Sequence, residues 1–349
     1  MIDVLVVGYG LAGRSFHAPL ILRQSSLRLS AIATRDIGRQ EQARSELGVP
    51  IFPSLNEAIE RLPNLRLVVI ATPHDSHVGL VETVLDAGKD CVVDKVMALT
   101  TSEADRMIAA RDRSGRMLSV FQNRRWDWDY LTFRSVVESG EIGRVRLVDS
   151  SVCRYSPPRT WRGRAGEAGT ILHDWGAHLV DQALQAGFGP CRRLHAWITP
   201  APWPGVDTGG HGRIVLEFDE VTFTVETSRI SPLERPRWWV IGTEGGFERI
   251  GIDPQEDALR SGRFDRVEDF GESRTIVQTI RDGKASTRTI APTRGSWDSF
   301  YANVAAHLEG RADLEVTAEQ GREVVRVLEA AGLSSDNHIA VEGPWGFPA

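Results

Sequence analysis

The chain opens on a run of aliphatic residues that leads directly into a glycine-rich turn, and this feature limits the possible folds more than any other. Residues 4–7 read Val-Leu-Val-Val, the composition of a buried strand, and glycines follow in the spacing G-x-G-x-x-G. In a strand–turn–helix unit the first glycine allows the tight turn, the second lets the backbone approach a pyrophosphate, and the third lets the helix pack closely on the sheet. Backbone N–H groups at the helix N-terminus would face the phosphates. The opening therefore predicts a dinucleotide site at five turn residues, which are Gly8, Gly10, Leu11, Ala12 and Gly13.

Strand and helix patterns then alternate as far as residue 122. We expect strands at 27–33, 67–71, 91–93 and 117–121, and helices at 39–47, 55–61, 78–87 and 101–113. The run at 67–71 is entirely apolar, as is typical of a strand buried on both faces of a parallel sheet. This alternation predicts an α/β fold with an N-terminal, doubly wound Rossmann domain over residues 1–122.

From residue 123 the pattern changes to longer strands joined by short turns. We expect strands at 144–155, 194–199, 213–218, 221–228 and 237–243, and helices at 130–139, 172–186, 296–308 and 318–331. The two-residue turn Asp219-Glu220 implies antiparallel pairing. We therefore expect a second, α+β domain over residues 123–349 with an open, mostly antiparallel sheet. The C-terminal helix of this second domain could either pack within that domain or pack back on the first domain.

Composition and charge exclude several classes of function. The net charge is −6 and the pI is about 5.9, which argues against a nucleic-acid surface. No stretch approaches the ~20 apolar residues that span a membrane. The short apolar run at the N-terminus feeds the glycine turn, so we interpret it as a strand and not as a signal peptide, and we expect a cytoplasmic protein. Cys91, Cys153 and Cys191 lack the spacing of metal ligands, and we expect reduced thiols and no metal.

Polar residues follow two of the expected parallel strands. Thr72-Pro73, with His77 shortly after, comes at the end of the strand at 67–71 and could form a rigid wall beside a nicotinamide ribose. An ordinary turn followed by a helix cap explains the same residues. Lys95 follows the strand at 91–93, where an ammonium needs a partner or a task. We expect it to hydrogen-bond a substrate hydroxyl and stabilise the developing alkoxide; the alternative is a surface lysine.

Asp174 and His178 are four residues apart and would share one face of the helix expected at 172–186. On that face His178 can accept a hydroxyl proton while Asp174 orients or charges its imidazole. Gly176 inside the helix costs about 1 kcal/mol relative to alanine, which indicates that something approaches it closely. A metal site and a purely structural role are the alternatives, although the spacing is not that of H-E-x-x-H.

Together these motifs resemble the Gfo/Idh/MocA family of NAD(P)-dependent sugar and polyol oxidoreductases over nearly the whole chain. The matching segments are Gly8–Gly13, Ser15–Pro19, Ala71–Pro73 with His77, Lys95, Arg124–Asp127, Asp174, His178–Leu184 and Asp253–Glu256. The segments 16–19, 125–127 and 251–262 look like the branch that contains the NADP-dependent scyllo-inositol dehydrogenases. The resemblance implies that Lys95, Asp174 and His178 are the catalytic residues. It also implies that the open sheet of the second domain, which handles substrate, forms the interface of a homodimer or homotetramer.

One position departs from the family pattern. The family usually has Glu-Lys-Pro where this chain has Asp94-Lys95-Val96. Proline fixes φ, so its replacement by valine puts the position of the Lys95 side chain in doubt.

The choice of dinucleotide depends on the end of the strand at 27–33. An acidic side chain there would hold the ribose 2′-OH of NAD, and an arginine would accommodate the 2′-phosphate of NADP. Thr34 and Arg35 stand at the expected tip, which favours NADP. Asp36 follows directly, so a shift of one residue would favour NAD.

These residues together predict reversible hydride transfer between a nicotinamide dinucleotide and a secondary alcohol of a sugar or cyclic polyol such as an inositol. Residues that could line the substrate pocket are arginines and aromatics, which are Arg124, Trp126, Arg154, Tyr155, Trp161 and Arg162. Two rival functions are a dinucleotide-binding sensor without catalysis and a reductase of a non-sugar ring. The loops at 156–168 and 200–211 carry no pattern that names the substrate.

Overall fold

The computed structural model describes residues 1–267 and 273–347, and their contacts divide the chain into two compact units. The first unit comprises 1–123, 256–266 and 297–322, and the second comprises 124–255, 267–296 and 323–349. The sequence suggested one boundary, between residues 122 and 123. The contacts place two later segments with the first unit as well, and one of them contains α10 (Asp298–Leu308).

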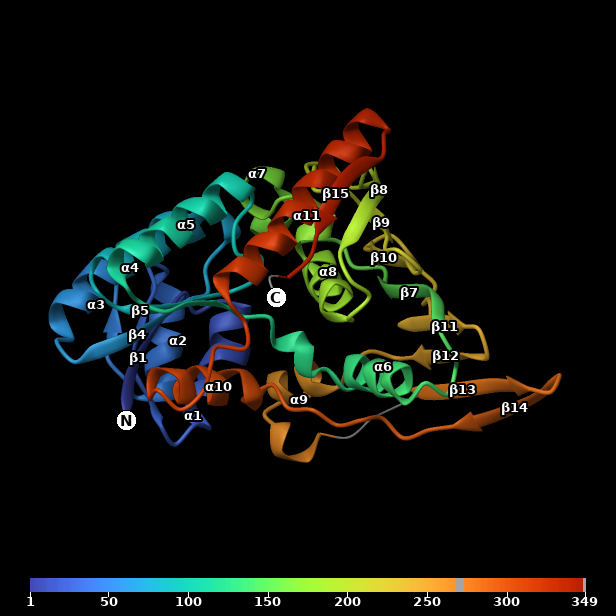
Figure 1. Ribbon diagram of the computed structural model, residues 1–349. Helices are drawn as coiled ribbons and strands as arrows, with labels where there is room; N and C mark the ends of the chain where they lie inside the picture. The colour runs from blue at the N-terminus through green and yellow to red at the C-terminus, as the bar shows by residue number, and fades with distance from the viewer. Residues whose placement is uncertain (268–272, 348–349) are drawn as a thin grey trace. The chain divides into compact units, whose positions relative to one another are not determined.

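The first unit is built on a six-stranded parallel sheet in the order β3-β2-β1-β4-β5-β6. Its strands are β1 (Ile2–Val7), β2 (Leu27–Ala33), β3 (Ile51–Phe52), β4 (Leu65–Ile70), β5 (Asp90–Val93) and β6 (Leu118–Val120). Its helices are α1 (Ala18–Leu22), α2 (Ile37–Leu47), α3 (Leu55–Arg61), α4 (His77–Asp86), α5 (Thr101–Ser114) and α10. Helices α4 and α5 lie together on one face, with α1 and α10 on the other (Figure 1). The predicted doubly wound Rossmann domain is confirmed.

Local signals fix several helix ends in this unit. The Ser54 side chain accepts a hydrogen bond from the backbone of the first turn of α3. Thr100 and Glu103 form a capping box at the start of α5. Gly48 and Gly115 end α2 and α5 in the left-handed conformation, with φ of 64° and 62°. These signals lie within a few residues of the helix ends that they fix, so they can be recognised in the sequence alone.

The second unit is built on a nine-stranded sheet in the order β14-β13-β12-β11-β7-β10-β9-β8-β15. All neighbours are antiparallel except β7 and β10, which run parallel. Its strands are β7 (Val145–Cys153), β8 (Cys191–Thr199), β9 (His211–Glu217), β10 (Thr222–Ser228), β11 (Trp238–Gly242), β12 (Gly245–Ile250), β13 (Arg274–Arg281), β14 (Lys284–Thr289) and β15 (Val341–Trp345). The predicted open, mostly antiparallel sheet is confirmed, but the four strands from β12 to β15 were not predicted.

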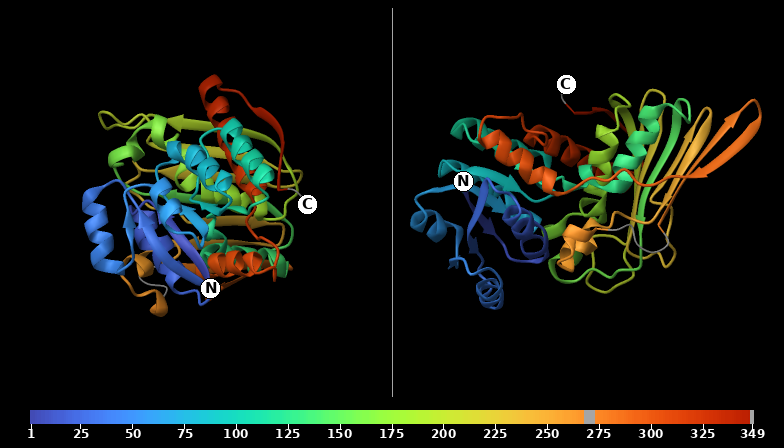
Figure 2. Two further views of the ribbon diagram at one scale, coloured as in Figure 1. Left: turned by 90° about the vertical axis from the view of Figure 1, so that its left-hand side faces the viewer. Right: turned by 90° about the horizontal axis from the view of Figure 1, so that it is seen from below.

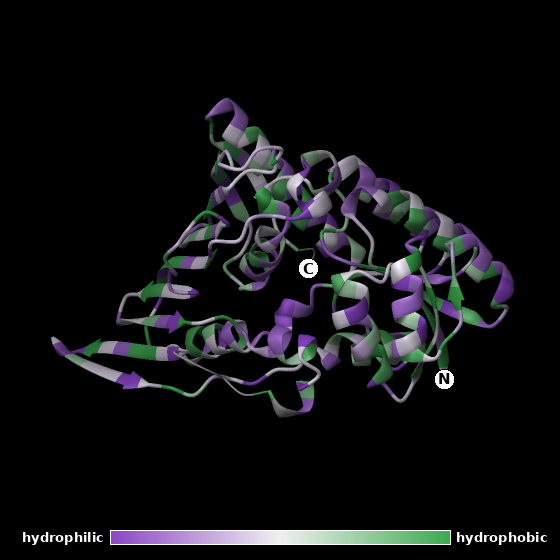
Figure 3. Ribbon diagram, turned by 180° about the vertical axis from the view of Figure 1, so that it is seen from behind, coloured by the Kyte–Doolittle hydropathy of each residue, from purple (hydrophilic) through white to green (hydrophobic). Residues whose placement is uncertain are grey.

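Helices cover one face of this sheet. Helices α6 (Trp128–Ser139) and α8 (Trp175–Gln185) pack on the same face (Figure 2). The short helix α7 (Ala165–Ala168) lies in a connection. Helix α9 (Gln255–Arg260) falls almost entirely in the first unit, and the last helix, α11 (Ala318–Asn337), begins in the first unit and continues into the second. Hydrophilic and hydrophobic residues alternate along the strands, which is the pattern of a sheet with two different faces (Figure 3). No helix among the described residues is both long enough and apolar enough to cross a bilayer.

Candidate functional site

The polar residues predicted from strand ends in the first unit meet at one edge of its sheet. Gly8 follows β1, Thr34 follows β2, Thr72 comes just after β4, and Lys95 comes just after β5. These four strands are parallel neighbours, so their carboxyl ends share one edge. Ligands of doubly wound sheets bind at this edge, near the point where the strand order reverses. Here the reversal falls between β1 and β4.

The three glycines of the turn have different surroundings. Gly8 has φ of +97°, and a Cβ on it would lie 2.4 Å from the carbonyl oxygen of Ala71. A Cβ on Gly13 would lie 2.0 Å from the carbonyl oxygen of Gly8. A Cβ on Gly10 would meet only the guanidinium of Arg39, at 3.5 Å. The fold itself thus requires Gly8 and Gly13, whereas the space beside Gly10 is suited to a phosphate that approaches the backbone closely. The cradle fits a dinucleotide.

Leu11 and Ala12 begin the helical segment that follows this turn. Leu11 is 41% exposed, and Ala12 is half-buried. The segment continues as a π-turn over Gly13–His17 and then as α1, which has Pro19 in its first turn.

The tip of β2 carries two exposed arginines. The strand ends at Ala33, so Thr34 stands at the tip, where it is buried, and its backbone is held by Phe52 and Gln40. Arg35 is exposed, and so is Arg39, whose guanidinium lies beside Gly10. The Asp36 carboxylate accepts a hydrogen bond from the backbone of Arg39, at 2.9 Å, as the N-cap of α2. The acidic residue that follows Arg35 in the chain therefore caps a helix through one of its carboxylate oxygens.

A buried histidine links the turns after β4 and β5. The His77 ring is fully buried, with Nε2 3.0 Å from the Thr72 carbonyl oxygen and Nδ1 3.0 Å from that of Val96. Burial lowers the pKa of His77, against the opposing effect of Asp94 and of the carbonyl oxygens that face the ring. Thr72 also bonds the hydroxyl of Ser76, at 2.7 Å, while Pro73 precedes the short turn that begins α4. Because its ring is buried, His77 would affect a bound dinucleotide by holding the backbone of the turns after β4 and β5 in place.

The backbone of Lys95 bonds the carboxylate of its neighbour Asp94, and the buried pair His17 and Tyr301 lies next to that carboxylate. The half-buried Lys95 has its backbone N–H 2.8 Å from Asp94 Oδ1. Behind the carboxylate, His17 Nε2 lies 3.8 Å from Oδ2, and His17 Nδ1 lies 2.7 Å from the hydroxyl of Tyr301. Burial alone would raise the pKa of Asp94, but His17 and Lys95 hold it below its ordinary value. Val96 does not leave this turn unsupported, because its carbonyl oxygen is bound by His77.

In the second unit, Asp174 stands just before a helix and not within it. A short 3₁₀ turn covers Ile171–His173, and α8 begins at Trp175. The expectation of one continuous helix was therefore wrong, because Asp174 has ψ of −96°. Its half-buried carboxylate binds Arg229 NH2 at 2.7 Å.

His178 lies in the first turn of α8 and is buried, with 5% of its surface exposed. Its ring packs against the edge of Trp175, and the Arg124 guanidinium lies 3.9 Å from the Trp175 ring centroid on a cation–π contact. The close approach expected at Gly176 comes from Leu172: a Cβ added to Gly176 would lie 3.3 Å from the Cβ of Leu172.

The other predicted pocket residues lie in three segments of the second unit. Trp126 is half-buried, and its carbonyl accepts a hydrogen bond from Gln255. Tyr155 is 63% exposed and packs edge-on against Trp203. Trp161 and Arg162 occupy one 3₁₀ turn, where the guanidinium lies 4.6 Å from the Trp161 ring.

Four residues at these sites were missed from the sequence, namely His17, Arg39, Arg229 and Tyr301. His17 and Tyr301 are 284 positions apart and Asp174 and Arg229 are 55 apart, and no local spacing reveals such partners. Arg39 could have been found, because it is one helical turn beyond Arg35 on an exposed helix start.

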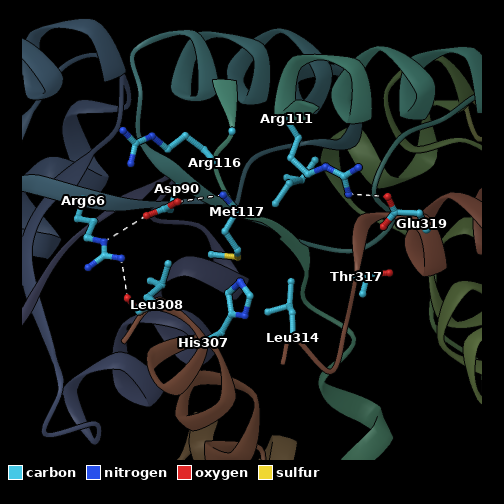
Figure 4. A pocket seen from close by; sticks show the side chains of 12 residues that line it. Arg66, Asp90, Arg111, Arg116, Met117, His307, Leu308, Leu314, Thr317 and Glu319 are labelled. Carbon is cyan, nitrogen blue, oxygen red and sulfur yellow. Dashed lines mark hydrogen bonds and ion pairs between the residues drawn. The ribbon is translucent and has the colours of Figure 1, made fainter. Parts of the chain in front are cut away.

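The first unit has a cavity at the edge of its sheet opposite to the glycine turn, and Figure 4 shows the residues that line it. It has a volume of about 420 Å³ and lies where β4, β5 and β6 begin, at Arg66, Asp90 and Met117. Arg66 binds Asp90 at 3.3 Å, and Arg111 binds Glu319 at 2.5 Å. The cavity is therefore separate from the glycine turn.

The cysteines play a packing role. All three are buried, and burial raises the pKa of Cys153 and of Cys191 to about 12, so the thiols stay protonated and inert. Within 1–267 and 273–347, no group of three or more His, Cys, Asp or Glu side chains is arranged to hold a metal ion.

A glycine turn at the carboxyl edge of a six-stranded parallel sheet defines a dinucleotide-binding α/β protein. Comparison with protein families agrees: residues 2–122 match the oxidoreductase family with an NAD-binding Rossmann fold, and residues 130–248 match the GFO/IDH/MocA C-terminal domain. The chain belongs to the Gfo/Idh/MocA family of oxidoreductases.

Relatives match along almost the full length. The chain is 33% identical to the NADP(+)-dependent scyllo-inositol 2-dehydrogenase IolW of Bacillus subtilis, over 96% of this chain and 94% of that protein. It is 31% identical to the uncharacterised oxidoreductase YdgJ of Escherichia coli, over 97% of both chains. Among solved structures, the Bacillus subtilis protein YvaA, described only as an oxidoreductase, superposes with a TM-score of 0.90 at 31% identity, over 98% of this chain and 100% of that one.

Proposed function

We propose that the protein transfers hydride between a nicotinamide dinucleotide, with NADP preferred, and a secondary alcohol or ketone of a sugar or cyclic polyol. The observation that carries this proposal is the arrangement of the glycine turn and Lys95 at one edge of the parallel sheet, with Gly10 open to a phosphate. Membership of an oxidoreductase family supports hydride transfer over simple nucleotide binding.

The bound nicotinamide would accept or supply the hydride. The chain's own residues handle the proton and the reacting oxygen. Lys95 donates a hydrogen bond to that oxygen and stabilises negative charge on it, while Asp94, which accepts the backbone N–H of Lys95, supports the turn that carries it. In oxidation, His178 accepts the hydroxyl proton, and in reduction it returns the proton. Asp174, bound to Arg229, orients the imidazole.

The tip of β2 supports the preference for NADP. Arg35 and Arg39 are exposed, with the guanidinium of Arg39 beside Gly10, and both suit a 2′-phosphate, since arginine binds phosphate through two parallel hydrogen bonds. Asp36 is engaged as a helix cap, so it is poorly placed to accept the 2′-OH of NAD. The relative IolW is named as an NADP(+) enzyme, which points the same way.

A kinetic screen tests this proposal. Inositols, aldoses and their keto forms are offered with NAD and with NADP, and the absorbance of reduced nicotinamide is followed. We expect turnover with NADP, and Lys95→Met should lower kcat by roughly 10²- to 10⁴-fold, the usual weight of such groups. The Kd for NADPH, measured by its fluorescence, should stay unchanged.

Two outcomes contradict the proposal. Full activity in Lys95→Met would remove Lys95 from the mechanism. Tight NADPH binding without turnover of any compound would favour the sensor function, in which the fold binds a dinucleotide and catalyses nothing.

A further inference from the structure

Two arginines, Arg154 and Arg229, directly follow neighbouring strands of the second unit's sheet, and one of them binds Asp174. Strands β7 and β10 run parallel with Cys153 opposite Ser228, so Arg154 and Arg229 follow the two strands at the same edge. The backbone N–H of Arg154 donates to the carbonyl oxygen of Ser228 at 3.0 Å, which fixes this register. Arg229 then reaches Asp174.

A third arginine joins them around the first residue of α8. The guanidinium of Arg124 lies 3.9 Å from the centroid of the Trp175 ring, and that of Arg154 lies 5.8 Å from the same centroid. Trp175 directly follows Asp174 in the chain. Three guanidinium groups therefore gather around the Asp174–Trp175 pair, whose carboxylate and neighbouring His178 are the proposed acid–base group.

The charges of this cluster do not balance. Arg124 is paired with Asp127 at 3.1 Å, and Arg229 with Asp174 at 2.7 Å. The exposed Arg154 contacts an aromatic ring but has no carboxylate within 4.0 Å in the part of the chain that the structure describes. The segment 154–162 carries two further arginines and no acidic residue. One positive charge is thus left over beside Trp175.

This arrangement suits an anion better than a neutral polyol. Hydroxyl groups need both donors and acceptors, whereas a guanidinium only donates. Its fork geometry matches carboxylate and phosphate, and such charge-assisted bonds are about twice as strong as neutral ones. Contact with the Trp175 ring restricts the guanidinium, so less freedom is lost when an anion binds.

We propose that the substrate of the proposed reaction carries a carboxylate or phosphate group and that Arg154 binds it. This inference rests on the proposed function and narrows its substrate class from sugars and polyols to their acidic derivatives. Arg154 would act in specificity, and the proton-transfer residues would be the same for every substrate.

Matched pairs of substrates test the inference. Glucose is compared with glucuronate and with glucose 6-phosphate, and myo-inositol with an inositol monophosphate, with kcat and KM measured for each. We expect kcat/KM to be roughly 10- to 100-fold higher for at least one anionic member, the effect of one charged hydrogen-bond pair. The carboxylate and phosphate arms show which anion is preferred.

Variants separate binding from chemistry. Arg154→Gln should raise KM for the preferred anion by roughly tenfold or more while kcat changes little, and any increase in KM for the neutral partner should be much smaller. Arg154→Lys should restore part of the loss. Arg134→Gln is the matched control, because Arg134 is an exposed arginine of α6 whose partner is Glu138.

The outcomes distinguish the two proposals. Equal or better turnover of the neutral members, or equal losses for both members in Arg154→Gln, overturns the anion inference and leaves hydride transfer intact. Absence of turnover for every compound with either nucleotide overturns the proposed function itself.

Discussion

Gly10 and Gly13 belong to the same turn, yet only one of them is demanded by packing. At Gly13 a methyl group would overlap the carbonyl oxygen of Gly8, at 2.0 Å. At Gly10 it would meet only the movable end of Arg39, at 3.5 Å. Packing therefore does not demand glycine at position 10, whereas the proposed approach of a phosphate to the backbone would.

Alanine at each position separates these two causes. We expect Gly13→Ala to destabilise the protein by about 1–3 kcal/mol or more, the cost of overpacking. Gly10→Ala should keep the melting temperature within a degree or two and weaken NADPH binding by roughly tenfold or more, because the backbone can no longer approach the phosphates. Thermal melts and NADPH titrations of both variants give the answer. Unchanged NADPH affinity in Gly10→Ala would mean that no phosphate lies against that residue.

At the scale of elements, one buried carboxylate serves two helix starts. Asp253 accepts hydrogen bonds from the backbone N–H of Trp128, which begins α6, at 2.6 Å, and of Gln255, which begins α9, at 2.8 Å. Burial, together with the nearby Asp129, raises the pKa of Asp253 to about 7. The role of Asp253 at α6 depends on the fold, because Trp128 and Asp253 are 125 positions apart.

The raised pKa of Asp253 makes a prediction about stability. Its folded pKa lies above its unfolded value of 3.8, so between these two values the folded state holds a proton that the unfolded state has lost. Stability should therefore fall as pH rises from about 5 to about 7, by up to about 1.4 kcal/mol per pH unit from this group. Melting temperatures across this range should fall less steeply in Asp253→Asn than in the native protein. Asp219→Asn is the control, because Arg192 lowers the pKa of that exposed carboxylate away from this range. Equal slopes in all three proteins would contradict the prediction.

Elements were predicted from sequence where their signals are local. The ends of α3 and α5 depend on caps within three residues. Strand β14 was missed because all of its residues are exposed and it is defined only by pairing with β13. The same limit applies to the candidate site. Lys95 and His178 are recognisable by type and spacing, but the partner that holds Asp174 comes from a strand end 55 residues away.

At the scale of the whole molecule, the sheet of the second unit presents one face with exposed apolar side chains. Helices α6 and α8 pack on the opposite face. Pairing places Trp239 opposite Asp149 and Ile241 opposite Leu147, so these side chains point to the same side. The most exposed apolar residues on this side are Leu147, Trp197, Trp239 and Ile280, each at least 40% exposed. An apolar surface spread over several strands is typical of an interface between protein chains.

We expect this face to join copies of the chain into a dimer or tetramer. In light scattering after gel filtration, the native protein should have a mass that is two or four times 38.6 kDa. Trp239→Glu replaces an exposed aromatic side chain of this face by a second carboxylate beside Asp149, which an interface tolerates poorly, and should shift the mass toward that of one chain. Leu22→Glu is the control, because it introduces the same charge at an apolar residue that is 58% exposed but lies on α1 of the first unit, outside the sheet of the second unit. The prediction is contradicted if the native protein has the mass of a single chain, or if Trp239→Glu keeps the native mass. Because His178 and the sheet belong to the same unit, loss of association with retained turnover would also show that the acid–base residues need no second copy of the chain.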